Sequence, residues 1–205
     1  MCYRYYIGTD FDIEKRFSTV PFGLGIDPNL NASPSHFLPI IRGNDSHERE
    51  ITIAKWGFIP KWAKDDKFAS KMANARSETV DQKPSFKNAF RSNRCIVPVS
   101  GFYEWKDIGE KKKVQYSIEP KDGEGFGLAG LWSIWDSPQN KKHLTFTILT
   151  TEPTKSISSI HHRMPVILER KEEEVWLEDK SSPNDLVEIF DPYPDKKLEI
   201  FETSK

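Results

Sequence analysis

The stretch of sequence that decides the fold lies at residues 94–105 and reads RCIVPVSGFYEW. Its apolar, β-branched first half is typical of a buried strand, and the Ser100-Gly101 pair predicts a turn. Shorter runs with alternating or continuous apolar residues predict further strands at 51–56, 114–119, 127–135 and 144–150. Many short strands without a βαβ rhythm favour an α+β fold with a largely antiparallel sheet.

Helical patterns are fewer and shorter. Residues 62–80 are polar with helical tendency, and residues 169–177 and 184–190 predict short helices, whereas residues 21–39 are rich in Pro and Gly and predict an irregular loop. No polar stretch is long enough to be a linker. We therefore expect one domain over residues 1–205, with a core at about 2–177 and an acidic C-terminal segment at 178–205.

Composition excludes several classes of protein. With 37% hydrophobic and 12% aromatic residues, the chain can bury a core and is not globally disordered. The mean hydropathy is −0.63, and neither a membrane-length apolar run nor a secretory signal is apparent, so we expect a cytoplasmic protein with no membrane contact. Two cysteines make no disulfide framework, and no metal or nucleotide motif is found, so we expect no metal or cofactor. We also expect a monomer.

The charge is unevenly distributed along the chain. Residues 55–113 hold fourteen Lys/Arg and seven Asp/Glu, whereas residues 169–205 hold six Lys/Arg and twelve Asp/Glu. A basic central region is typical of a phosphate-binding face. A solvated surface of mixed charge explains the same counts, and charge alone leaves both interpretations open.

Cys2 follows the initiator methionine, so removal of Met1 would leave cysteine at the chain end. Such a residue carries a thiol and an α-amine whose ordinary pKa is about 7.7–8.0, well below that of lysine. A neutral amine attacks aldehydes to give a Schiff base, onto which the thiol can close. Alternation in the apolar-aromatic run of Tyr3, Tyr5, Tyr6 and Ile7 would pair this segment into a sheet and hold Cys2, although position 2 could equally be a frayed terminus. Cys95 lies in an apolar run and is expected in the core.

Two further residues are candidates for proton transfer. Glu104 is flanked by aromatic residues, and partial desolvation would raise its pKa toward neutrality. The other interpretation is a strand whose one polar position faces water. His161 lies between a polar stretch and an apolar strand, where an imidazole could act as general acid or base. On a strand, its neighbour His162 would face the opposite way.

Other residues could bind a phosphate or a base. Asn74 and Arg76 are two residues apart and would share one side of an extended segment, although a helix cap beside a solvated arginine fits the pattern too. Most of the six tryptophans should be core, but Trp62 and Trp105 adjoin lysines. Exposed rings beside cations are typical of single-strand binding.

Taken together, several segments resemble the SRAP family, the SOS response-associated peptidase or abasic site processing domain. They occur in the family's order and read MCYR, LNASP, WGFIPKWA, NARSET, RCIVPVSGFYEW, LAGLW, FTILTTEPT and IHHRMPVIL. One departure is Tyr3, where the family usually has glycine. A bulky side chain at this position could narrow the pocket.

The resemblance implies a barrel-like sheet with flanking helices and a protein that senses abasic sites in single-stranded DNA. Cys2 would form a thiazolidine DNA–protein crosslink, which protects the site during the DNA damage response. The pocket residues would be Asn74, Arg76, Glu104 and His161, and the supporting DNA contacts would be Arg4, Pro34, Trp62, Trp105 and Thr150.

Two alternatives remain open. The first is a peptidase in which Cys2 is the nucleophile and its own α-amine is the base, with self-removal of Met1 as the minimal reaction. The second is a module that binds single-stranded DNA without covalent chemistry, for which Cys2 is incidental.

Overall fold

The computed structural model describes residues 2–67, 69–178, 181 and 183–203. The strands are β1 (Tyr5–Ile7), β2 (Asn29–Ala32), β3 (Phe37–Gly43), β4 (Arg49–Trp56), β5 (Asn74–Arg76), β6 (Arg94–Val99), β7 (Gly101–Asp107), β8 (Lys113–Pro120), β9 (Phe126–Asp136), β10 (Lys142–Thr151), β11 (Met164–Pro165), β12 (Ile167–Leu168) and β13 (Leu198–Glu202). The helices are α1 (Ile13–Phe17), α2 (Lys87–Ser92), α3 (Lys155–Ser158), α4 (Arg170–Leu177) and α5 (Pro183–Glu188), with 3₁₀ turns η1 (Ala69–Met72), η2 (Ser77–Thr79) and η3 (Asp195–Lys197).

Five strands close into a barrel in the order β10-β4-β3-β6-β9, because β9 also pairs with β10. Every pairing within the barrel is antiparallel except that of β4 with β10, which places Trp56 beside Phe146 in a parallel register. The predicted α+β fold with a barrel-like, mainly antiparallel sheet is therefore confirmed. Closure pairs the barrel strands on both sides and leaves them no free edges.

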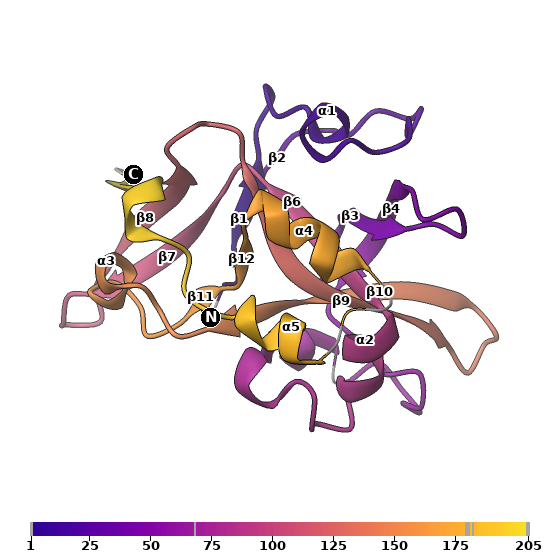
Figure 1. The fold of residues 1–205 in the computed structure, drawn as a ribbon. Coiled ribbons are helices and arrows are strands. Elements are labelled where there is room, and N and C mark those ends of the chain that lie inside the picture. The colour runs from indigo at the N-terminus through magenta and orange to yellow at the C-terminus, as the bar shows by residue number, and fades with distance from the viewer. Residues whose placement is uncertain (1, 68, 179–180, 182, 204–205) are drawn as a thin grey trace.

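A second sheet of five strands, in the order β13-β8-β7-β1-β2, lies beside the barrel (Figure 1). The predicted turn at Ser100 separates β6, a barrel strand, from β7, a strand of this second sheet. The Ser100 amide donates to the Tyr6 carbonyl at 2.8 Å, so β1 anchors the turn. The stretch at residues 94–105 thus links the two sheets.

The core is built around Trp56, whose ring packs 5.0 Å from Tyr5 and 6.1 Å from Phe146. Its indole donates to the Ala73 carbonyl at 2.8 Å, which satisfies the one polar atom of the ring. Cys95 is fully buried in β6, as predicted. These contacts join β1, at the N-terminus, to the inside of the barrel.

The predicted helix at 169–177 is α4, which begins with a capping box between Glu169 and Glu172. Helix α4 lies over the barrel, where the indole N–H of buried Trp176 donates a hydrogen bond of 2.8 Å to the carbonyl oxygen of Cys95 on β6. The second predicted helix is α5, in which Leu186 of the C-terminal segment is buried, and Ile189 directly after the helix is buried as well. The same segment ends in β13, which pairs with β8.

The expectation of helical structure across residues 62–80 is wrong. This segment holds turns, the 3₁₀ elements η1 and η2, and the strand β5. β5 lies parallel to β10, with Asn74 opposite Ile148 and Arg76 opposite Thr150. A polar strand of this kind is fixed by a distant partner strand, and no local apolar period reveals it.

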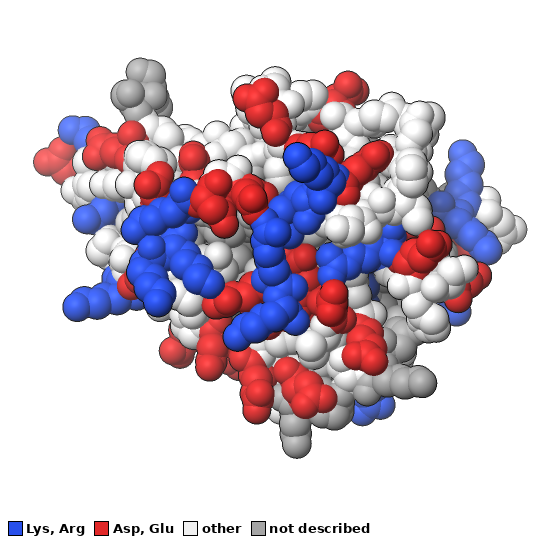
Figure 2. All heavy atoms as spheres, turned by 45° about the horizontal axis from the view of Figure 1, so that its top comes forward, with Lys and Arg blue, Asp and Glu red and all other residues white. Residues whose placement is uncertain are grey.

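The face shown in Figure 2 carries charges of both signs, and its lysines and arginines lie among aspartates and glutamates. Within the described residues, no helix is long and apolar enough to span a membrane. The same part of the chain contains no cluster of ligands suited to a metal ion.

Candidate active site

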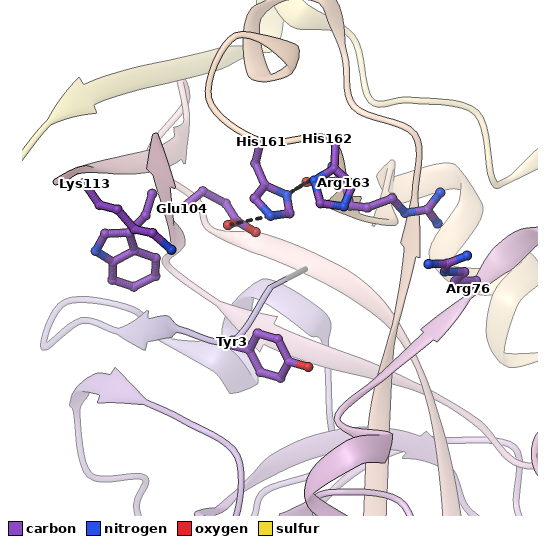
Figure 3. A pocket seen from close by; sticks show the side chains of 8 residues that line it. Tyr3, Arg76, Glu104, Lys113, His161, His162 and Arg163 are labelled. Carbon is purple, nitrogen blue, oxygen red and sulfur yellow. Dashed lines mark hydrogen bonds and ion pairs between the residues drawn. The ribbon is translucent and has the colours of Figure 1, made fainter. Parts of the chain in front are cut away.

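A pocket of about 470 Å³ opens where the second sheet meets the barrel (Figure 3). It is lined by the segment before β1, by β5, β7 and β8, and by the loop between α3 and β11. The lining residues are Tyr3, Arg76, Glu104, Trp105, Lys113, His161, His162 and Arg163. The volume lies in the range of sites for small molecules, and the lining combines a carboxylate and imidazoles with several cations.

Glu104 projects from β7 and is only 3% exposed. Burial raises the pKa of its carboxyl group from 4.5 to about 7, because the charged form loses its hydration. One carboxylate oxygen lies 4.0 Å from Nε2 of His161. Near neutral pH the Glu104 carboxyl group therefore exists in both protonation states and can give or take a proton.

The imidazole of His161 is oriented by its own loop. Its Nδ1 lies 3.1 Å from the backbone nitrogen of Arg163 and 3.0 Å from the carbonyl oxygen of that residue. Burial lowers the pKa of His161, so the neutral ring is favoured. The expectation that His162 faces the opposite way is wrong, since this segment is a loop and the two rings stack at 4.3 Å.

Cys2 is fully buried and precedes Tyr3, a residue of the pocket lining. The side-chain amide of Asn74 donates to the carbonyl oxygen of Cys2 at 2.9 Å, and the Cys2 thiol lies 3.7 Å from the carbonyl oxygen of Arg4. Burial raises the pKa of the thiol, mainly through desolvation of the thiolate. The sulfur is therefore a protonated thiol at neutral pH and requires a base before it can act as a nucleophile.

Asn74 and Arg76 lie on the extended strand β5, which agrees with the extended alternative and not with the helix cap, and Arg76 is exposed in the pocket. Thr150, opposite Arg76, is fully buried. Arg163 donates to the Thr150 carbonyl oxygen and forms a bidentate ion pair with Glu78. Thr150 is therefore connected to the pocket by its hydrogen bond with Arg163, which lines the pocket.

The remaining predicted residues lie at different distances from the pocket. Trp105 lines it, whereas Arg4 donates to Oδ1 of Asn31 at 2.9 Å and is half-buried. Pro34 lies half-buried in the turn between β2 and β3. Trp62 is 64% exposed and lines a separate groove of about 390 Å³ together with Lys61 and Lys142.

Sequence reasoning missed Lys113 and Arg163 as pocket residues. Arg163 stands two positions after His161, and that spacing was the available signal. Lys113 ends a run of three lysines that looks like an ordinary solvated turn. Only the pairing of β7 with β8, which places Lys113 opposite Asp107, brings this lysine to the pocket.

The structure thus combines a closed barrel and a flanking second sheet with a buried Cys2 next to a pocket that contains Glu104 and His161. The chain belongs to the SRAP family, described as SOS response associated peptidase, and matches it over residues 1–205.

Relatives and solved structures agree with this assignment. The chain is 39% identical to abasic site processing protein YoqW of Bacillus subtilis, over 100% of this chain and 92% of the relative. It is 33% identical to abasic site processing protein HMCES of Gallus gallus, over 74% of this chain and 54% of that protein. A crystal structure from Bacteroides thetaiotaomicron superimposes with a TM-score of 0.90 at 27% identity, covering 99% of this chain and 92% of that one.

Proposed function

We propose that this protein recognises abasic sites in single-stranded DNA and links itself to them covalently through Cys2. Relatives that match along the whole chain are named abasic site processing proteins. The observation that carries the proposal is the placement of Cys2, which Asn74 holds next to a pocket containing Glu104 and His161.

The chemistry begins once Met1 is removed and the α-amine of Cys2 is free. The open form of an abasic deoxyribose carries an aldehyde, and the amine adds to its carbon to give a carbinolamine. Protonation of its hydroxyl and loss of water leave an iminium ion. The thiol then gives its proton to the base that the first step generated, and the sulfur adds to the iminium carbon. Aldehyde and aminothiol thus combine to a thiazolidine with release of one water. The closed ring removes the carbonyl that otherwise promotes strand breakage by β-elimination.

Each proton transfer has a group suited to it. Glu104, with a pKa of about 7, can protonate the departing hydroxyl and then accept the proton of the Cys2 thiol. That second step matters because burial keeps the thiol protonated. His161 lies within 4.0 Å of Glu104 and would exchange a proton with the sugar hydroxyl as the ring opens.

The DNA backbone would be held by cations around the pocket. Arg76, Lys113 and Arg163 all line it. Trp62 and Trp105 would stack on bases, and Arg4, Pro34 and Thr150 would support the strand from positions further away. An abasic nucleotide has no base to unstack, which favours it over an intact one.

Intact-mass spectrometry after incubation with a single strand bearing one abasic site tests the proposal. We expect loss of Met1 and a new species heavier by the oligonucleotide minus one water. Cys2→Ala should give no adduct, whereas Cys95→Ala, the matched change at the other buried cysteine, should give one. If Cys2→Ala forms the adduct as well as the wild type does, the covalent mechanism is wrong. If no adduct forms while Cys2→Ala retains full affinity for the strand, the non-covalent alternative holds.

A peptidase is the second candidate, and the family's description favours it. In this alternative the Cys2 thiol attacks a peptide carbonyl, with Glu104 or the free α-amine as base. Release of peptides that requires Cys2, in the absence of any DNA adduct, would support the peptidase over the crosslinking function.

A further inference from the structure

The ring of Tyr3 lies in the pocket, and no described residue binds it. It is 39% exposed, and within the described part of the chain its side chain makes no hydrogen bond or ring–ring contact. The next two tyrosines differ, because Tyr5 packs on Trp56 at 5.0 Å and Tyr6 stacks on Tyr103 at 5.2 Å. Tyr3 is therefore the tyrosine of this segment whose ring is left open to a ligand.

The backbone that carries this ring is fixed on both sides. The carbonyl of Cys2 accepts the hydrogen bond from Asn74, and the carbonyl of Arg4 accepts one of 2.9 Å from the amide of Tyr103. An aromatic side chain on an anchored backbone loses little conformational entropy when it binds a flat ligand, since only two side-chain torsions remain to be fixed.

The surroundings of the ring match those of a nucleotide. Figure 3 shows Tyr3 across the pocket from Glu104 and His161, with Lys113 and Arg76 to either side. Cations beside an open aromatic ring are the combination with which proteins bind single strands, because the cations track phosphates and the ring stacks on a base. A deoxyribose without its base would fill only part of the pocket's roughly 470 Å³.

We propose that Tyr3 is a stacking platform for the base of a nucleotide next to the abasic one. The inference rests on the proposed function and extends it to a sequence preference. A purine offers a larger face to the ring than a pyrimidine, so abasic sites flanked by purines should bind more tightly than sites flanked by pyrimidines.

The test measures affinity without the covalent step. The probes are short single strands that carry a stable tetrahydrofuran abasic analogue, which has no aldehyde, flanked by adenines or by thymines. The wild type should bind the adenine-flanked strand several-fold more tightly. Tyr3→Leu, which keeps bulk but removes the aromatic face, should weaken that binding roughly 5- to 100-fold and abolish the difference between the strands. Tyr3→Phe should retain both properties.

A spectroscopic measurement separates stacking from bulk. With 2-aminopurine as the flanking base, the wild type and Tyr3→Phe should quench its fluorescence on binding more than Tyr3→Leu does. Equal affinities and equal quenching in all three proteins would overturn the inference. Faster adduct formation by Tyr3→Leu on a true abasic strand would overturn it too, because the Tyr3 ring would then obstruct the substrate. Failure of the wild type to form any adduct overturns the proposed function instead, since the affinity and fluorescence results do not depend on adduct formation.

Discussion

Asn74 donates a hydrogen bond of 2.9 Å from its side-chain amide to the carbonyl oxygen of Cys2. The bond connects β5, a strand held by β10, to the segment that carries the proposed nucleophile. Oδ1 of the same amide is buried and has no hydrogen-bond partner within the described residues. Asn74 thus positions Cys2 through its nitrogen and leaves an acceptor unused.

Asn74→Ala should slow adduct formation more than it destabilises the fold. Loss of one hydrogen bond costs about 1 kcal/mol of unfolding free energy, but release of the Cys2 backbone should lower the single-turnover rate about tenfold. Quenched-flow gel assays and urea unfolding measure the two quantities. Gln139→Ala, at an exposed amide side chain in the turn between β9 and β10, is the control and should change neither. An unchanged rate in Asn74→Ala would contradict the positioning role.

Glu104→Gln should change how stability depends on pH. In the folded protein the pKa of Glu104 is raised to about 7 by burial, so the charged form is disfavoured there. The stability associated with this group is therefore complete below its ordinary pKa of 4.5 and is lost as the pH rises through 7. The amide cannot ionise, so the variant should be more stable than the wild type at pH 8, by up to about 3 kcal/mol, and similar at pH 4.5.

Thermal or urea unfolding across this pH range measures the effect, with exposed Glu152→Gln as the control. Adduct formation by Glu104→Gln should be strongly slowed at every pH, because the amide cannot exchange the proton. Equal pH dependence of stability in the variant and the wild type would show that Glu104 does not titrate as its burial requires.

Much of the fold could be predicted because its signals are local. The apolar run at 94–99 and the turn at Ser100 define β6 and the start of β7 directly. The two-residue spacing of Asn74 and Arg76 predicts a shared orientation only for an extended backbone, and local sequence did not decide between that alternative and a helix cap. The helical expectation around them was wrong because β5 exists only through its pairing with β10.

The pocket itself could not be derived from local patterns. Glu104 and His161 belong to different elements, and their separation of 4.0 Å depends on how the second sheet meets the barrel. Family resemblance supplied these residues as a group. It did not supply Lys113, which reaches the pocket through strand pairing, nor the stack of His162 on His161.

Glu78→Ala should impair the site while leaving the fold nearly intact. Glu78 holds the guanidinium of Arg163, whose backbone orients His161. The pair is partly exposed, so its loss should cost no more than about 1 kcal/mol. Because Arg163 lowers the pKa of Glu78, this contribution is present above the ordinary carboxyl pKa and is lost as the pH falls.

The rate of adduct formation by Glu78→Ala should fall about three- to tenfold, since a loosened Arg163 no longer fixes the imidazole. Lys112→Ala, which breaks the exposed pair between Lys112 and Glu110, is the matched control and should leave the rate unchanged. Equal rates of adduct formation in the two variants would show that the Glu78–Arg163 pair does not orient His161.

Trp62→Ala should weaken DNA binding without changing its salt dependence. Trp62 is 64% exposed beside Lys61 and Lys142, so its removal should alter the unfolding free energy by less than about 0.5 kcal/mol. Loss of a base–aromatic stack should raise the dissociation constant for a single strand about tenfold. The slope of log affinity against log salt should stay the same because an indole neutralises no phosphate, whereas Arg76→Ala should reduce it by about one. Phe201→Ala, which removes an exposed aromatic ring on β13, is the control. An equal rise of the dissociation constant in Phe201→Ala would show that Trp62 makes no specific contact with the DNA.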